Sequence, residues 1–175
     1  IDDIDDILPG LLENKSRVFY TMGIHSDFDK RVIGWVNGLR LQSRAGIHTP
    51  GEFVAIEHHL HDMRLYKSSY EITRMRKAAK ISSKAHIRAM QTCKPGMNEC
   101  QIEAELQHQF GMQGARFPAY SSIVGGGKNS CILHYVTNSD VLNDGDILLI
   151  DAGAELECYA SDISRTFPVN GTFSK

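Results

Sequence analysis

The sequence predicts a mixed α/β (α+β) protein: the tail of an α/β domain over residues 1–60, then helices packed on a mainly antiparallel sheet over residues 61–175. Two observations lead to this prediction. Helix-like and strand-like segments alternate in the first part, as they do in α/β domains. In the second part, two segments with helical periodicity come first, and a region rich in β-forming residues follows from Tyr120 onward.

The first part contains four expected elements before a polar stretch. They are a helix over Ile4–Leu12, a strand over Arg17–Met22, a helix from Ser26 or Asp27 to about Arg44, and a short strand over Glu52–Ile56. The polar, histidine-rich stretch from His58 to Ser69 is interpreted as the boundary between the two domains. Its histidines are interpreted as solvated rather than metal-binding.

Two helices are expected at the start of the second part. Ser69 is a candidate N-cap for the first helix, which Pro95-Gly96 ends. Asn98 is a candidate N-cap for the second helix, which should reach about Gln113. The apolar stripes of both helices are interpreted as core faces.

The remaining chain is expected to form short strands separated by turns. The candidate strands are SSIV (121–124), CILHYV (131–136), DILLIDAG (146–153) and a closing segment over 159–169. The glycines at 125–127 favour a flexible turn. A phosphate-binding loop of the form G-x-x-x-x-G-K-[ST] is excluded, because Asn129 follows the lysine and Ser122 replaces the first glycine.

Two aspartates stand out between residues 148 and 164, where a strand of core residues ends on Asp151 and Asp162 follows eleven positions later. A hairpin that turns near Leu156 and Glu157 would place the aspartates directly opposite each other, with Cβ atoms about 4.5–5.5 Å apart. Carboxylates this close repel, and a divalent cation removes the conflict. Oxygen ligands suit Mn²⁺, Mg²⁺ or Ca²⁺, and an added histidine favours Mn²⁺, Co²⁺ or Zn²⁺. The alternative is a turn residue at Asp151 and a solvated Asp162, or one paired with Arg165.

Composition limits the partners and the compartment. The formal net charge of −2 favours neither nucleic acid nor an anionic membrane as a partner, and no apolar run approaches the about 20 residues of a membrane-spanning helix. The four cysteines form no Cys-x-x-Cys pair, which indicates reduced, mostly buried thiols and a cytoplasmic setting. The chain begins at Ile1 without an initiator methionine, so we interpret it as part of a longer protein.

Four strings carry a family resemblance: HDMRLYKS (61–68), KPGMNE (94–99), ARFPAYSSIVGGGKNSCILHY (115–135) and LLIDAGAELECYASDISRTFPVNG (148–171). They resemble the Xaa-Pro aminopeptidase (aminopeptidase P) family, and the similarity runs over essentially the whole chain. The resemblance implies the C-terminal part of that family's N-terminal α/β domain, followed by the first half of its pita-bread catalytic domain. It also implies a metal-dependent exopeptidase, which releases the N-terminal residue from peptides with proline in the second position.

The resemblance also implies roles for single residues. Asp151 would chelate one ion of a two-ion Mn²⁺ centre that also admits Co²⁺ or Zn²⁺, and Asp162 would bridge both ions. His134 would be the catalytic histidine that holds the scissile carbonyl and its oxyanion. Supporting roles near the metal are implied for three hydroxyl side chains, those of Tyr120, Ser164 and Thr166.

Two other functions stay open: a prolidase, which shares the two aspartates, and a non-catalytic binding module with the same fold. The family's remaining ligands, one histidine and two glutamates, are expected beyond residue 175. Two carboxylates are too few ligands for a tight centre, so this chain alone is expected to be inactive and to bind ions weakly or not at all. Half of a catalytic domain would leave an apolar face open, which favours a homo-oligomer.

Overall fold

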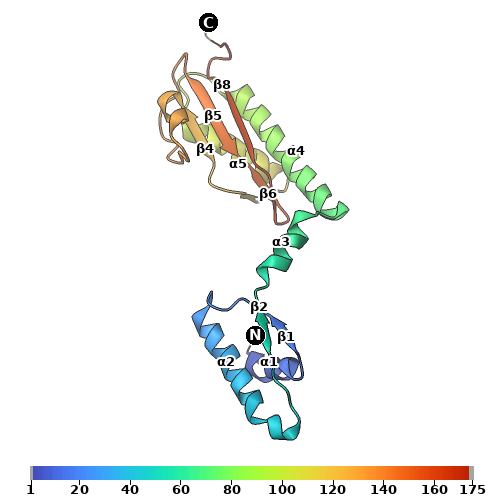
Figure 1. Cartoon of the computed structure of the whole chain (residues 1–175). Helices are drawn as coiled ribbons and strands as arrows, with labels where there is room; N and C mark the ends of the chain where they lie inside the picture. Colours follow the sequence, from blue (N-terminus) through green and yellow to red (C-terminus); the bar gives the residue numbers. More distant parts are fainter. Residues whose placement is uncertain (1, 174–175) are drawn as a thin grey trace. The chain divides into compact units, whose positions relative to one another are not determined.

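The computed structural model describes residues 2–173, and the chain divides into two compact units, residues 1–66 and 67–175 (Figure 1). Helices combine with one parallel strand pair and two antiparallel sheets, which confirms the predicted mixed fold class. The domain limit predicted at 60/61 falls inside a helix of the first unit, and the two compact units meet after Tyr66.

The first unit is a small α/β arrangement in which one helix connects two parallel strands. Its elements are α1 (Ile4–Leu12), β1 (Arg17–Phe19), α2 (Ser26–Leu41), a 3₁₀ turn (Ser43–Ala45), β2 (Glu52–Val54) and α3 (Glu57–Leu65). β1 and β2 pair in parallel, with Val18 opposite Phe53, and parallel strands need a crossover connection such as the one that α2 provides. The buried side of α2 consists of Val32, Val36 and Leu39.

One prediction for this unit is wrong. Neither Ser26 nor Asp27 caps α2, because the N-cap position is His25, whose side chain makes no cap hydrogen bond. The polar stretch interpreted as a boundary does include the limit between the two compact units, after Tyr66. Most of this stretch is helical, since α3 has Glu57 in its first turn and Arg64 in its last turn. Each of these charges suits the helix dipole. No residue of α3 is buried, and its apolar side chains Leu60, Met63 and Leu65 are exposed.

Two helices open the second unit, and capping boxes close both of their N-termini. They are α4 (Ser69–Thr92) and α5 (Glu99–Met112). The Glu71 N–H donates to Ser68 Oγ at 3.3 Å, and the Ser68 N–H donates to the Glu71 carboxylate at 2.6 Å. The cap of α4 is therefore Ser68, one residue before the predicted Ser69. Asn98 caps α5 as predicted, together with Gln101.

Two small antiparallel sheets complete the second unit. Their strands are β3 (Phe117–Pro118), β4 (Ile123–Gly126), β5 (Ile147–Ala152), β6 (Ala154–Leu156), β7 (Tyr159–Ala160) and β8 (Ile163–Pro168). The strand order is β4-β5-β8 in one sheet and β3-β6-β7 in the other, and Figure 1 shows α4 and α5 running beside the strands. Leu106 and Phe110 of α5 share one buried cluster with Leu148 and Ile150 of β5, so the two helices cover the inner face of this sheet.

β5 alternates between the core and the opposite face. Leu148 and Ile150 are fully buried, whereas Leu149 and Asp151 are only partly buried. Because successive side chains of a strand point to opposite faces, Asp151 lies on the face away from the core. β5 therefore includes this acid, next to its last residue Ala152, without placing a carboxylate in the core.

The predicted strand CILHYV does not form. A 3₁₀ turn covers Gly127–Cys131, and residues 132–140 follow without helix or strand. His134 and Asn138 have φ values of 54° and 47°, a left-handed conformation that does not occur inside a strand. The predicted glycine turn is also displaced, because Gly125 and Gly126 belong to β4.

The structure shows the state and the exposure of the four cysteines. All four cysteines are free, but three of them are exposed, so the prediction that the thiols are mostly buried is wrong. Only Cys93 is partly buried, and this burial raises the pKa of its thiol.

Within residues 2–173, no helix combines the length and the apolar character needed to cross a membrane.

Candidate metal centre

A tight hairpin turn separates β6 from β7. Leu156 pairs with Tyr159, and the two residues between them, Glu157 and Cys158, have φ values of 52° and 68°. Two successive positive φ values are the conformation of a type I′ turn, whose twist matches that of the flanking strands. The predicted turn, near Leu156 and Glu157, lies one residue too early.

This shift changes how the two aspartates meet. Asp151 is paired with Ser164, so the predicted direct pairing with Asp162 is wrong. The observed partner of Asp151 lies an even number of residues from the predicted one, and side chains alternate along a strand with a period of two. The two carboxylates therefore keep the same face of the hairpin, as diagonal neighbours, with Asp162 one residue before β8.

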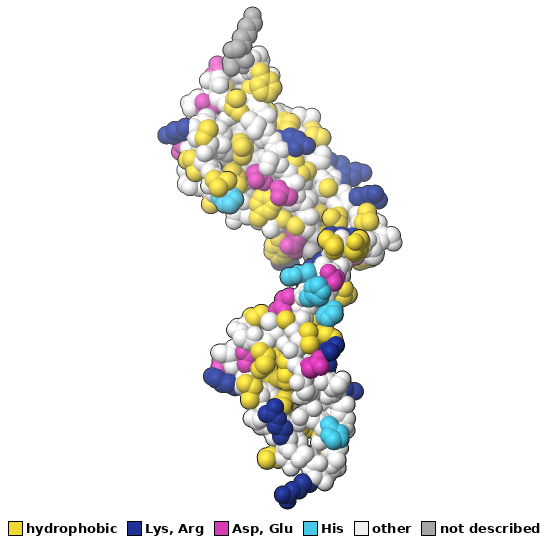
Figure 2. Space-filling view, in the orientation of Figure 1, with side chains coloured by type: hydrophobic (Ala, Val, Ile, Leu, Met, Phe, Trp, Pro, Cys, Tyr) yellow, Lys and Arg dark blue, Asp and Glu magenta, His cyan; other side chains and the backbone are white. Residues whose placement is uncertain are grey.

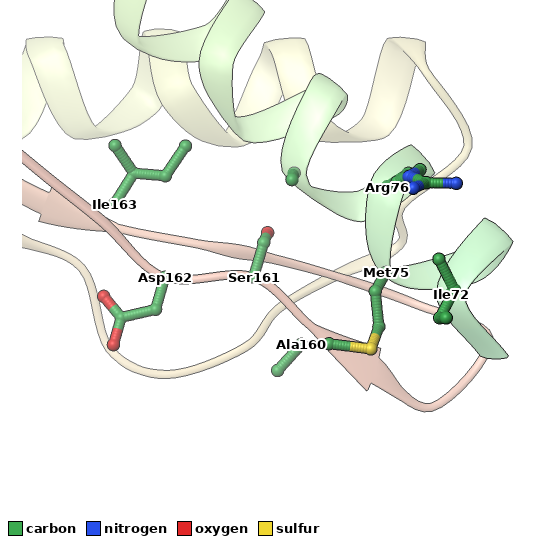
Figure 3. Close-up of a pocket in the computed structure, with 8 residues that line it drawn as sticks. Ile72, Met75, Arg76, Ala160, Ser161, Asp162 and Ile163 are labelled. Atoms are coloured by element: carbon green, nitrogen blue, oxygen red, sulfur yellow. The ribbon is translucent and has the colours of Figure 1, made fainter. Parts of the chain in front are cut away.

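Gly153 lies between β5 and β6 and lets two backbone segments approach closely. A Cβ atom at this position would lie 1.6 Å from the carbonyl oxygen of Ser161. Ser161 is buried, and its Oγ lies 2.7 Å from Oγ of Ser82 in α4. In Figure 3 the Ser161 hydroxyl points toward α4, whereas the Asp162 carboxylate points away from it. This close approach at Gly153 accompanies the outward orientation of Asp162.

Tyr120 joins the two carboxylates. Its hydroxyl oxygen lies 2.5 Å from Asp151 Oδ1 and 2.9 Å from Asp162 Oδ1. The single hydroxyl hydrogen can be donated to only one of these oxygens at a time. Burial, and then the hydrogen bonds to the two aspartates, raise the pKa of the Tyr120 hydroxyl well above its ordinary value, so it stays protonated. Two carboxylates thus converge with one donor between them, an excess of negative charge that a divalent cation would neutralise.

His134 borders the same hollow as the carboxylates. A cavity of about 370 Å³ is lined by Tyr120, Ser121, Ile123, His134, Val136, Asp151 and Asp162. An adjoining hollow of about 270 Å³ shares His134 and Asp151 and is also lined by Ser164. Thr166 lines neither hollow and lies exposed on β8, opposite Leu149. Five of the six predicted site residues therefore lie around two adjoining hollows.

A third hollow lies on the α4 side of the hairpin and is mainly apolar (Figure 3). It is lined by Ile72, Met75, Arg76 and Ala79 of α4 and by residues 160–163. Asp162 is its only carboxylate, and it has no histidine, so its lining offers no second metal or acid–base site.

Exposed hydrophobic side chains also occur on the loop that carries His134, where Leu133 is 84% exposed.

The other histidine group does not form a metal site. His58, His59 and His61 belong to α3, where Figure 2 shows histidine side chains gathered at the surface. His58 Nε2 lies 3.5 Å from the Asp62 carboxylate, and the ring of His59 packs edge-on against Phe19. Within the described residues 2–173, no three His, Cys, Asp or Glu side chains come together as an ion site. Asp151 and Asp162 are a pair of carboxylates, and carboxylate oxygens are groups that suit divalent cations.

A buried network that supports this site was not predicted. Glu99, in the first turn of α5, is fully buried and accepts a hydrogen bond from the Tyr135 hydroxyl at 2.8 Å. Asn129 is also buried and donates to Glu99 at 3.0 Å. An acid at a helix N-terminus is usually an exposed partner of the helix dipole. Nothing in the sequence distinguishes the buried acid from the usual exposed one.

Comparison with known proteins places the chain in a family. Residues 73–175, more than half of the chain, match the model of metallopeptidase family M24, and the chain belongs to this family. Over 173 residues it is 43% identical to the Xaa-Pro aminopeptidase of Escherichia coli (strain K12), an overlap that covers 99% of this chain and 39% of that protein.

Solved structures give the same result. The structure of Pseudomonas aeruginosa aminopeptidase PepP matches with a TM-score of 0.93 and 56% identity, over 99% of this chain and 39% of that one. Zn-substituted E. coli aminopeptidase P in complex with product matches with a TM-score of 0.93 and 43% identity, over 99% and 40% of the two chains. The resemblance to Xaa-Pro aminopeptidases is confirmed, and the chain spans 39–40% of the length of these relatives.

Proposed function

We propose that the protein containing this chain is a metal-dependent Xaa-Pro aminopeptidase, which removes the N-terminal residue from peptides with proline in the second position. The observation that carries the proposal is the convergence of Asp151 and Asp162 on the Tyr120 hydroxyl beside His134. Similarity to the E. coli and P. aeruginosa enzymes over 99% of the chain supports it. Because the chain spans 39% of these relatives, we assign the activity to the longer protein.

The proposed centre would take two Mn²⁺ ions, with the carboxylates of Asp151 and Asp162 among their ligands. Carboxylate oxygens suit Mn²⁺, and Zn²⁺ and Co²⁺ are alternatives, since one relative is known in Zn-substituted form. Such ions would supply a Lewis acid for the scissile carbonyl and a water of lowered pKa. With two ligating side chains in the described residues, the 175-residue chain alone would hold ions weakly and hydrolyse no peptide.

The chain's own side chains would position the substrate and the ligands. His134, exposed at the hollow beside Asp151, would donate a hydrogen bond to the scissile carbonyl oxygen and stabilise the negative charge that develops there. Tyr120 would orient the Asp151 carboxylate through its hydroxyl. We propose supporting roles on β8 for Ser164, opposite Asp151, and for Thr166, two residues farther along the strand.

We also propose a cytoplasmic homo-oligomer whose partners are peptides rather than nucleic acid or membrane. The exposed side chains of Leu133 and Val136 support self-association, and four free cysteines support a reducing compartment. Analytical ultracentrifugation of the longer protein tests the oligomer. A strictly monomeric species at micromolar concentration would contradict it.

Peptide hydrolysis by the longer protein tests the proposed activity. We expect release of the first residue from an Xaa-Pro-Yaa tripeptide with Mn²⁺, loss of activity with EDTA, and recovery when Mn²⁺ is added back. Hydrolysis of Xaa-Pro dipeptides alone would instead indicate a prolidase. Bound metal without hydrolysis of either peptide would indicate a binding module and would contradict the proposal.

A further inference from the structure

Residues 127–140, which we call the His134 loop, contain no strand, yet they bring His134 to the hollow beside Asp151. His134 itself has a left-handed backbone, with a φ of 54°. A loop without strand pairing needs other contacts to hold such a conformation. These contacts come mainly from α5, through Glu99 and Glu103, which lie on one side of the helix because they are four residues apart.

Glu99 is fully buried and accepts four hydrogen bonds. Its Oε1 accepts from the Gly126 N–H at 2.7 Å and from the Asn129 side-chain amide at 3.0 Å. Its Oε2 accepts from the Tyr135 hydroxyl at 2.8 Å and from the Asp140 N–H at 2.9 Å. Three of these donors belong to the His134 loop, and Tyr135 is the direct neighbour of His134.

The arrangement around Glu99 requires a carboxylate. Each oxygen accepts two hydrogen bonds, and charge-assisted bonds of this kind are the strong ones. A glutamine would turn its NH₂ group toward two donors in either orientation, because an amide has only one acceptor atom. Glu99→Gln therefore keeps the shape of the side chain and removes at least two of its contacts to neighbouring donors.

Asn138 holds the later part of the His134 loop against β4. Its Oδ1 accepts from the Val124 N–H at 3.0 Å, and its Nδ2 donates to the Ser122 carbonyl at 2.9 Å. The same Nδ2 lies 2.9 Å from Glu103 Oε2. His134 thus lies between two anchored points of the loop, Asn129 and Asn138, and the buried Glu99 also anchors its direct neighbour, Tyr135.

We propose that Glu99 is the positioning residue for His134: its buried carboxylate fixes the His134 loop, and through Tyr135 it sets where the imidazole stands relative to Asp151. Glu99 does not touch the hollow, so it acts only through the loop. The catalytic consequence of this inference rests on the proposed peptidase function, whereas the structural consequence does not.

The test uses the longer protein loaded with Mn²⁺ and compares Glu99→Gln with Glu105→Gln. Glu105 is a matched control because it lies on the same helix and its carboxylate pairs with Arg88 at 2.5 Å. In E99Q, we expect hydrogen exchange of amides 127–140 to rise at least about tenfold while the amides of α4 do not change. We expect kcat on an Xaa-Pro peptide to fall about 100-fold with KM altered less than about threefold. The reason is that a misplaced His134 imidazole lowers kcat more than it weakens substrate binding. E105Q should change neither readout.

A double variant separates positioning from a merely structural role. In an H134A background, E99Q should lower kcat by less than about threefold further, because residues that act as a unit are not additive. Equal losses in both backgrounds would contradict the proposal. If E99Q does not fold, Y135F removes the single hydroxyl next to His134, and we expect faster loop exchange and about a tenfold loss of kcat.

Unchanged exchange of residues 127–140 in the folded variants would overturn the positioning role. If the wild-type protein hydrolyses no Xaa-Pro peptide, the proposed function fails. The exchange measurement still decides whether Glu99 holds the loop, so the two failures are distinguishable.

Discussion

The two segments that carry the candidate site are held in different ways. Asp151 and Asp162 lie on a hairpin whose strands pair with each other around a two-residue turn. His134 lies on a loop without strand pairing. The loop's anchors are Glu99 and Glu103 of α5, whose hydrogen bonds to the loop span 36 and 35 residues of sequence. The position of the two aspartates therefore depends on local backbone pairing, whereas the position of the histidine depends on buried side-chain contacts between distant parts of the chain.

In the hairpin, we expect the largest loss of stability from a substitution at Gly153. Gly153→Ala would bring a Cβ to 1.6 Å from the Ser161 carbonyl, so the strands must separate, at a cost of about 3 kcal/mol in free energy of unfolding. Urea denaturation followed by circular dichroism measures this. Gly111→Ala is the control, since no atom lies within 4 Å of the added Cβ in α5, and it should stabilise by up to about 1 kcal/mol. Equal effects of the two substitutions would contradict the close approach at Gly153.

In the His134 loop, the loss of one side-chain hydrogen-bond donor is expected to lower the stability of the protein. Asn138→Asp keeps the acceptor for Val124 N–H but replaces the donor to Ser122 and Glu103 by a carboxylate oxygen. We expect a loss of about 2 kcal/mol in free energy of unfolding, from unpaired buried groups and like-charge repulsion. Glu103→Gln in the N138D background should recover part of this loss, which a double-mutant cycle measures. No coupling between the two substitutions would show that the loop is not held here.

A smaller effect is expected outside the site, at the cap of α4. Ser68→Ala removes the acceptor for the Glu71 N–H and should cost about 1 kcal/mol. Ser69→Ala, at the cap position predicted from sequence, should lie within about 0.5 kcal/mol of wild type. Thermal denaturation of the two variants distinguishes the caps, and a larger loss for S69A would contradict the assignment.

The same cap makes stability depend on pH. Hydrogen bonds from the Ser68 N–H, and then from the Ser68 and Tyr159 side chains, lower the pKa of the Glu71 carboxyl from 4.5. A lowered folded-state pKa means that the contribution is complete above the unfolded value and is lost as pH falls through the folded value. Denaturation of Glu71→Gln should therefore show a smaller loss of stability at acidic pH than the wild type. Identical pH profiles would contradict this contribution.

The elements that the sequence predicts correctly are those with local signals. The period of apolar residues and the cap at Asn98 predict α5, and the family strings predict which residues gather at the site. The turn at Glu157–Cys158 is displaced by one residue because neither residue is the asparagine or glycine that usually marks a type I′ turn. Since side chains alternate along a strand, this small error turns an expected pair into diagonal neighbours.

The position of His134 could not be predicted from its own segment. CILHYV has the composition of a strand, but Glu99 and Asn138 provide hydrogen bonds that hold it as a loop with positive φ values. Such contacts depend on which distant residues the fold brings together. Tertiary contacts of this kind override local β-propensity.

The metal content of the longer protein tests the central claim, that Asp151 and Asp162 together hold the ions. Purified wild type, D151N, D162N and the control D144N are dialysed against Mn²⁺, and bound metal is measured by mass spectrometry. Asp144 is an exposed acid of the same unit whose carboxylate accepts from Asn170. We expect about two ions per chain in wild type and D144N, and loss of at least about one ion in each of the other two variants. Wild-type metal content in both D151N and D162N would contradict the account.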